Sequence, residues 1–367
     1  MIGGEIMLGI IFNMHKVRFV DLDNLLGKVT TSDDIDTVNV FINLEPIFRK
    51  VATNPDMVKY LKVQTQEKNN EFIAEVINLA AHYRLFFNKA RLKSKIYMYF
   101  GYPFTVGGPY ANRRYVDEYR MNYQEKFTRD TNGRIVGNLI NDTVSIISTI
   151  CNYIDGVYFV PMDYIEPSLL PKFMVHKFGS KSLNLIVTND RYEYQYVNQG
   201  FTIIRVKYPH HYVVTKDNLI QVLKQEEKIS NDIIIPPHFI SFLLSFMGDS
   251  RRNIPRVKNI GLGRLLPLID KAIKEGSITL DTKNIQLLTD FLKEEIQDVV
   301  KNNFYCIDVD IQSVYLGSGF DISIQEKLID KYDNHSLKLL NEEYFSDHPM
   351  MLMELTTELR SKKNIFG

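Results

Sequence analysis

The chain has 367 residues, with 44 basic and 44 acidic side chains. A content of 45% hydrophobic and 24% charged residues is typical of globular proteins, which excludes disordered, collagen-like and coiled-coil classes. Because the formal net charge is zero, no global field attracts nucleic acid or an anionic membrane, so any such contact has to be local. The length predicts two domains or one elaborated domain.

Cysteine spacing and the N-terminal sequence both indicate an intracellular protein. Cys151 and Cys306 are too isolated in the sequence for a disulfide framework or a zinc site, so we expect a reducing, cytoplasmic location. The apolar run 7–14 is too short to span a bilayer, and it lacks the basic start and cleavage site of a signal peptide. No Trp and many Ile, Asn and Lys residues suit an A/T-rich coding genome such as that of a phage.

Strand and helix patterns alternate through the first half of the chain. Residues 1–35 hold two short apolar runs closed by a polar turn, which predicts a strand-rich N-terminal extension. Helical spacing separates five patterns of buried strands, at 38–42, 95–100, 156–160, 183–188 and 202–206. This alternation predicts an α/β core over 36–207, with a mostly parallel sheet flanked by helices.

The second half of the chain is helical. Two prolines at 236 and 237 open an apolar helix at 239–247, and a basic loop punctuated by glycines leads to further helices, up to about residue 302. We therefore assign 208–310 to a helical region and 311–367 to a C-terminal extension.

The most informative segment is 236–266, PPHFISFLLSFMGDSRRNIPRVKNIGLGRLL. It resembles the helix-hairpin-helix region of the 5′-nuclease family, which includes flap endonucleases, phage 5′ to 3′ exonucleases and the 5′-nuclease domain of bacterial DNA polymerase I. In that family a helix ends in Gly-Asp-Ser, a loop reads Asn-Ile-Pro-x-Val, and Gly-Ile-Gly starts the next helix. The resemblance implies a PIN-like α/β core at 36–207 and a DNA-binding region at 208–310.

The same segment has the chemistry of a site for the DNA backbone. Gly261 and Gly263 let the chain approach a phosphate, and amides at the start of the next helix point at it. Five basic residues and no acid lie among 14 residues here, which gives a neutral protein a local positive surface. They are Arg251, Arg252, Arg256, Lys258 and Arg264. The alternative interpretation is a helix–loop–helix used only in packing, with solvated basic residues.

A second DNA-contacting segment is implied upstream. Residues 110–114 resemble the Tyr-Lys-x-Asn-Arg sequence of the family's helical arch, which places an arch at about 104–132. The resemblance therefore adds Arg113 and Arg114 to the expected DNA-binding residues.

Metal-binding acids are largely missing. The family clamps the reacting phosphodiester between two divalent cations about 3.5–4 Å apart, and hard Mg²⁺ requires oxygen ligands. Position by position, Glu166, Asp190 and Asp249 match family acids, but Tyr192 and Arg252 stand where further acids are expected. Three carboxylates hold at most one cation loosely, and an arginine brings permanent positive charge to the place of the second. We therefore expect the arginine to pair with Asp249 or Asp190, and the two-metal mechanism to fail.

The first family acid can be placed in two registers. Asp21 keeps the family spacing to a following Asn but leaves 79 residues to Phe100, whereas Asn43 leaves 57, closer to a helix-sized crossover. We prefer the second register, which puts an amide at the acid position and leaves Glu45 as a nearby carboxylate. Phe100 itself, with Gly101, replaces another expected acid.

We therefore expect a phage-type 5′-nuclease fold that binds branched or single-stranded DNA, or a protein partner, with metal-dependent cleavage impaired or lost. No cofactor is assigned, Mg²⁺ being the cofactor if the protein is active. The alternative interpretation of the remnant acids is that they serve only as helix caps and ion pairs. One alternative is an active, divergent 5′ to 3′ exonuclease or flap endonuclease of phage DNA replication, in which Asp21, Asp155, Asp163 or Glu193 replaces a missing ligand. The other is a structural subunit of a viral assembly, with the terminal extensions docking protein partners.

Overall fold

The computed structural model describes residues 35–45, 92–101, 115–119, 156–162, 166–175, 178–179, 181–205, 212–233, 235–279, 288–290 and 292–316, with single positions within 76–87 and 143–151. Several predictions fall outside these residues. They concern the N-terminal extension up to residue 34, most of the arch region, the chain from residue 317 onward, and Asp21, Arg113, Arg114, Asp155 and Asp163.

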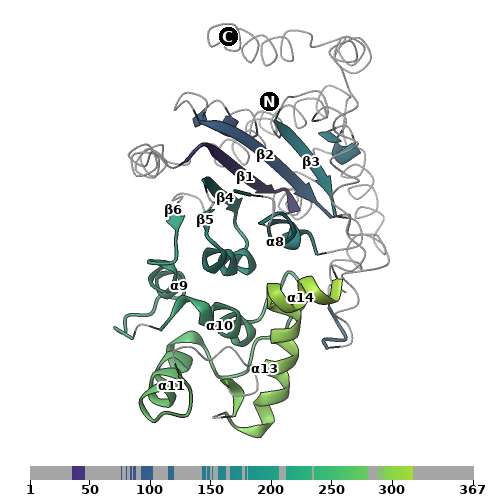
Figure 1. Cartoon of the computed structure of the whole chain (residues 1–367). Helices are drawn as coiled ribbons and strands as arrows, with labels where there is room; N and C mark the ends of the chain where they lie inside the picture. Colours follow the sequence, from purple (N-terminus) through teal and green to yellow (C-terminus); the bar gives the residue numbers. More distant parts are fainter. Residues whose placement is uncertain are drawn as a thin grey trace, which may run out of the picture.

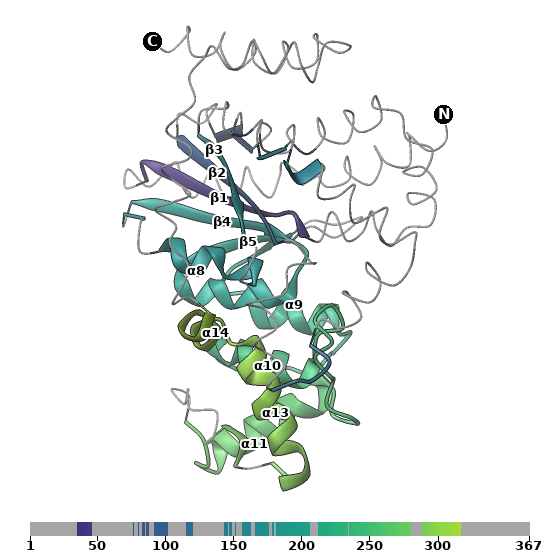
Figure 2. The same ribbon diagram turned by 90° about the vertical axis from the view of Figure 1, so that its right-hand side faces the viewer.

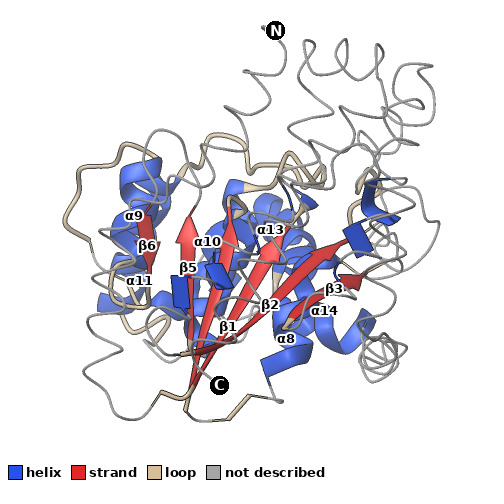
Figure 3. Ribbon diagram, turned by 90° about the horizontal axis from the view of Figure 1, so that it is seen from above, coloured by secondary structure: helices blue, strands red, loops and turns tan. Residues whose placement is uncertain are grey.

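Six strands form one sheet in the order β3-β2-β1-β4-β5-β6 (Figures 1 and 3). The first five strands pair in parallel, and β6 runs antiparallel to β5. This confirms the predicted α/β class with a mostly parallel sheet. The strands are β1 (Thr37–Asn43), β2 (Lys93–Phe100), β3 (Val157–Pro161), β4 (Ser182–Thr188), β5 (Phe201–Arg205) and β6 (Tyr212–Val214).

The central strand β1 shows why the apolar runs become strands. Six of its seven residues are buried, since it pairs with β2 on one side and β4 on the other while side chains cover both faces. Its polar Asn39 is satisfied by Asn184 of β4, at 2.9 Å. The strand ends at Asn43, as the preferred register predicted. The strand that the sequence did not predict, β6, has only three residues.

The helices follow the predicted order. Helix α10 directly continues the turn η5 at the apolar segment predicted to be helical, and a loop connects it to α11, whose N-cap is Gly261. The α-helices are α8 (Leu170–Met174), α9 (Leu219–Glu226), α10 (Ile240–Met247), α11 (Leu262–Lys274), α13 (Glu294–Ile307) and α14 (Val309–Leu316). The 3-10 helices are η2 (Pro167–Leu169), η4 (Arg191–Gln199) and η5 (Pro237–Phe239).

One apolar core joins the sheet to the helical region. Helices α9, α10, α11 and α13 lie on one side of the sheet, with α11 farthest from it (Figures 1 and 2). Buried side chains form a continuous cluster from Phe41 of β1, through η4, to Leu266 of α11 and Val309 of α14. This core crosses the predicted boundary at residue 207, and α14 crosses the one at residue 310 to contact α8 and η2. No helix in the described part of the chain is long and apolar enough to cross a membrane.

The parallel strands bring several polar positions to one edge of the sheet. The carboxyl ends of β1, β2, β4 and β5 lie at this edge, and two residues separate the end of β4 from the start of η4. In open α/β sheets ligands bind outside the carboxyl ends of strands. The loop that follows α10 reaches the same edge, because Arg251 contacts Asn189, the residue directly after β4.

Candidate functional site

A buried arginine lies among three carboxylates at this edge of the sheet. The side chain of Arg252 is 1% exposed. Its Nη2 donates to Glu166 at 3.0 Å, to Asp190 at 2.9 Å and to the hydroxyl of Ser168 at 2.9 Å. Its Nε donates to Glu166 at 3.2 Å, and its Nη1 donates to Asp249. Arg252 was predicted to pair with Asp249 or Asp190, and it pairs with both.

Local structure fixes two of these carboxylates at turns. Asp190 is the N-cap of η4 and accepts the backbone N–H of Tyr192 at 3.0 Å, while its own N–H donates to the hydroxyl of Thr188 at 2.9 Å. Glu166 precedes η2, and its Oε2 accepts from the hydroxyl of Tyr119 at 2.9 Å. Tyr119 belongs to the predicted arch region, so the described part of that region contributes to the cluster.

Asp249 is positioned by a tight turn at the end of α10. Gly248 has φ +63°, and a Cβ there would lie 2.7 Å from backbone atoms of the loop, so only glycine fits. The backbone of Asp249 then pairs with Ile254, and its Oδ1 accepts the N–H of Arg251 at 2.8 Å. Asn303 of α13 anchors the loop by donating to the carbonyl of Pro255 at 2.7 Å.

These residues do not fit two divalent cations. The three predicted metal ligands do meet, but the guanidinium of Arg252 fills the space between their oxygens. Among the described residues no group of three or more His, Cys, Asp or Glu side chains is arranged to hold a metal ion. The same geometry corrects the expectation that Arg252 contacts DNA, because its nitrogens are buried and directed inward.

The charges of the cluster stabilise one another. Burial alone would raise the pKa of Asp190, but the charges of Arg252 and Arg251 outweigh burial and hold that pKa below its ordinary value. Burial disfavours the charged form of Arg252, yet Asp190, Glu166 and Asp249 raise the pKa of the guanidinium well above its ordinary value. Asp190 and Arg252 are therefore both ionised at neutral pH.

A fourth acid, Glu193, lies behind the cluster and is fully buried. Its Oε1 accepts from the hydroxyl of Tyr99 and from the side-chain amide of Asn43, the latter at 3.1 Å. Burial first, and then the charge of Asp190, raise the pKa of Glu193 to about 8. Burial therefore favours the protonated form of Glu193, which lies at the ends of β1 and β2. The backbone N–H of Glu45 donates to Asn43 at 3.0 Å.

The predicted DNA-contacting residues of the loop divide into two groups. Arg256, Lys258 and Arg264 are exposed, as is Gly263, and Gly261 is the N-cap of α11. Arg251 instead turns toward β4, where its Nη2 donates to the backbone and side-chain oxygens of Asn189.

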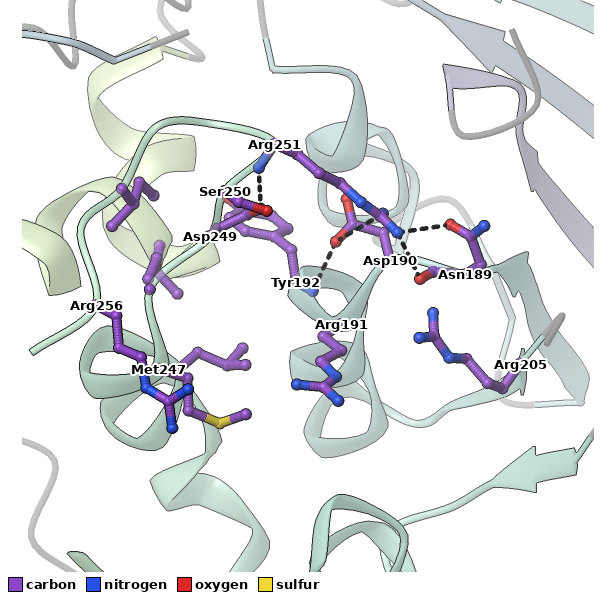
Figure 4. Close-up of a pocket in the computed structure, with 14 residues that line it drawn as sticks. Asn189, Asp190, Arg191, Tyr192, Arg205, Met247, Asp249, Ser250, Arg251 and Arg256 are labelled. Carbon is purple, nitrogen blue, oxygen red and sulfur yellow. Dashed lines mark hydrogen bonds and ion pairs between the residues drawn. The ribbon is translucent and has the colours of Figure 1, made fainter. Parts of the chain in front are cut away.

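A pocket of about 470 Å³ opens beside the acidic cluster (Figure 4). It lies between the start of η4, the end of β5 and the loop after α10. Besides Arg251 and Arg256, its wall includes Arg191 and Arg205, which sequence reasoning missed. Each of these two is an isolated basic residue far from the basic loop in sequence, so no motif marks it.

Comparison with solved structures identifies the fold. A bacteriophage T5 flap endonuclease pseudo-enzyme, solved as a product complex with DNA and metal ions, is 12% identical, with a TM-score of 0.50 over 80% of this chain and 97% of that one. T5 flap endonuclease co-crystallised with metal ions is 13% identical, with a TM-score of 0.49 over 80% and 97%. T5 5′-exonuclease with zinc is 12% identical, with a TM-score of 0.47 over 80% and 96%.

The chain therefore has the fold of the phage-type 5′ nucleases, as its sequence resemblance predicted. The similarity lies in structure alone: no protein-family model matches the sequence, and no curated protein matches it at a significant level.

Proposed function

We propose that this protein is a DNA-binding member of the 5′-nuclease fold, from a phage, whose metal-dependent cleavage is lost or severely impaired. The observation that carries this proposal is the buried Arg252, which binds all three remaining acids of the expected metal site.

The charge of Arg252 opposes metal binding directly. Two-metal catalysis needs cations a few ångströms apart to clamp the attacking and leaving oxygens. Here a permanent positive charge lies within 3.0 Å of oxygens of Glu166 and Asp190. A cation would have to displace this guanidinium, and breaking a buried ion pair typically costs about 3–5 kcal/mol. Cleavage through this site is therefore disfavoured even at high Mg²⁺ concentration.

DNA binding is supported by the exposed side of the same loop. Three exposed basic residues surround the amino end of α11, where backbone N–H groups favour an anion. The T5 structure with the same fold is a complex with DNA. We propose branched or single-stranded DNA as the ligand, bound at Arg256, Lys258 and Arg264, with the arch residues Arg113 and Arg114 as further contacts.

The test combines binding and cleavage on one substrate. Fluorescently labelled 5′-flap DNA is titrated with the protein in EDTA and followed by anisotropy, and is then incubated with Mg²⁺ or Mn²⁺ and resolved by gel. We expect saturable binding without cleavage above that of Asp190→Ala protein purified in the same way. Cleavage that Asp190→Ala abolishes would overturn the proposal in favour of an active, divergent exonuclease. Absence of binding to flap, single-stranded and duplex DNA would instead favour a structural subunit.

A further inference from the structure

The pocket beside the acidic cluster combines an apolar part with guanidinium groups, and Asp190 and Asp249, which pair with Arg252, also line it. Four apolar side chains line it, namely Leu244, Met247, Ile254 and Ile307. The guanidinium groups come from η4, β5 and the loop, three segments far apart in sequence (Figure 4). Its volume of about 470 Å³ lies within the range of pockets that hold small molecules.

Two of the arginines each carry a nitrogen that makes no hydrogen bond within the described part of the chain. The side chain of Arg205 is 9% exposed, and its Nε lies 3.2 Å from Glu226, but its Nη1 is buried and has no hydrogen-bond partner among the described residues. Nη1 of Arg251 forms an ion pair with Asp190 at 3.5 Å but makes no hydrogen bond to any described residue. Unsatisfied buried donors are costly, so such groups call for a partner.

A third arginine stands at the exposed side of the pocket. The side chain of Arg256 is 57% exposed, and its Nη2 is 3.9 Å from Glu227. The missing side chain of Gly261 makes room for it, because a Cβ there would lie 2.9 Å from the same nitrogen. Arg256 is thus held only loosely and can turn toward a bound ligand.

The balance of charge indicates what kind of ligand fits. Arg191 is paired with Glu226 and Glu227, each at 2.6 Å, so much of the positive charge is already neutralised. Attraction therefore depends on directed N–H donors rather than on a long-range field. A phosphate group has several terminal oxygens, which can accept from separate guanidinium groups at once, and arginine is well suited to such contacts. The apolar part of the wall suits a sugar or base attached to the phosphate.

We propose that this pocket binds a phosphate monoester through the donors of Arg205, Arg251 and Arg256, without a metal ion. The phosphate is either the 5′ end of a DNA strand or part of a free nucleotide. The choice of DNA as one ligand rests on the proposed function, whereas the pocket itself does not.

Calorimetric titration in EDTA tests the pocket with defined probes. These are inorganic phosphate, deoxyadenosine monophosphate, deoxyadenosine, and two otherwise identical flap DNAs that carry a 5′-phosphate or a 5′-hydroxyl. We expect the monophosphate to bind and deoxyadenosine to bind at least about tenfold more weakly, since it lacks the charged group that accepts hydrogen bonds from the arginines. Tighter binding of the phosphorylated flap would identify a DNA end as the source of the phosphate. Equal binding of the two flaps would identify the free nucleotide.

Variants assign the effect to the pocket. Arg256→Ala removes an exposed side chain and should weaken monophosphate binding about tenfold without affecting the fold. Arg205→Gln tests the buried donor, with its thermal melt as the check on folding. Lys181→Ala is the matched control, because Lys181 is exposed at the opposite edge of the sheet, beside the start of β4.

The outcomes separate this inference from the proposed function. Two outcomes would overturn phosphate binding in the pocket even if flap DNA still binds. One is equal affinity for the monophosphate and the nucleoside, and the other is an equal loss of monophosphate affinity in Lys181→Ala and Arg256→Ala. Monophosphate binding without any DNA binding would support the pocket and overturn the DNA-binding function.

Discussion

The guanidinium carbon of Arg252 lies 4.3 Å from the centre of the Tyr192 ring. Both residues stand where the family pattern has an acid, so two departures from that pattern contact each other. A cation over an aromatic face is stabilising, more so when water is excluded, as it is for these two buried side chains. Arg252 and Tyr192 therefore form one buried contact, and we expect substitutions at the two positions to be non-additive.

Removing the buried arginine should destabilise the protein. In Arg252→Ala the three carboxylates lose their shared partner, and like charges then face each other in a buried site. We expect a loss of about 3–5 kcal/mol in the free energy of unfolding, measured by urea denaturation. Added Mg²⁺ should restore part of this loss by binding only the folded state. An Arg252→Ala variant that unfolds at the same urea concentration as wild type, with and without Mg²⁺, would contradict the assigned pairing. Lys181→Ala controls for the loss of a positive charge.

Restoring both acids should create a metal site. Arg252→Asp alone replaces a cation with a carboxylate, but the Tyr192 ring still fills part of the space. The double variant Arg252→Asp with Tyr192→Asp should bind Mn²⁺ more tightly than either single variant, as measured by the loss of the free-ion signal in electron paramagnetic resonance. Equal affinities for the double variant and wild type would show that other residues block the site.

Glu193 should make stability depend on pH in a defined window. Its pKa is about 8 in the folded protein, against about 4.3 in an unfolded chain. Between these values the folded protein keeps a proton that the unfolded chain has lost, so the free energy of unfolding falls as pH rises, by at most about 1.4 kcal/mol per pH unit. Below and above this window the contribution is constant.

Glu193→Gln keeps the neutral form at every pH and should flatten this slope. The variant should be more stable than wild type at about pH 8 and differ least near pH 5. Urea denaturation across this range measures the effect, with Glu275→Gln, an exposed site, as control. An unchanged slope in Glu193→Gln would exclude a protonated Glu193.

The exposed basic residues should set the salt dependence of DNA binding. If Arg256, Lys258 and Arg264 each contact a phosphate, every charge removed should reduce the log–log slope of affinity against salt by about one, with little sequence preference. Anisotropy titrations of duplex DNA at several salt concentrations measure the slope. A triple alanine variant that binds like wild type would assign the loop to packing, and Lys181→Ala supplies the control for nonspecific charge loss.

The sequence predicted the sheet well because its strands are buried on both faces. Largely apolar runs such as 38–42 and 183–188 are typical of strands in the interior of a parallel sheet. Strand β6 was not predicted because three residues are too few to show the alternating pattern of a strand. Its place in the sheet is set by pairing with β5.

The candidate site was predicted only where a local motif marked it. The pairing of Arg252 followed from its position in the loop sequence, but its depth did not, since burial of a charge depends on partners such as Glu166 that lie 86 residues away. Likewise, Glu193 accepts a hydrogen bond from Tyr99, which is 94 residues away in the sequence. Arg205 lines the pocket because the sheet places the end of β5 there. Such contacts are set by tertiary packing, which spacing along the chain does not encode.

The continuous core between the sheet and the helices has a mechanical consequence. Because buried side chains connect Phe41 of β1 to Leu266 of α11 without a break, the described parts of the two regions pack as one unit. This packing sets the span between the basic loop and the edge of the sheet in the structure. A DNA ligand that touches both has to bend or fray to match this span, so the protein would select nucleic acids by how easily they deform.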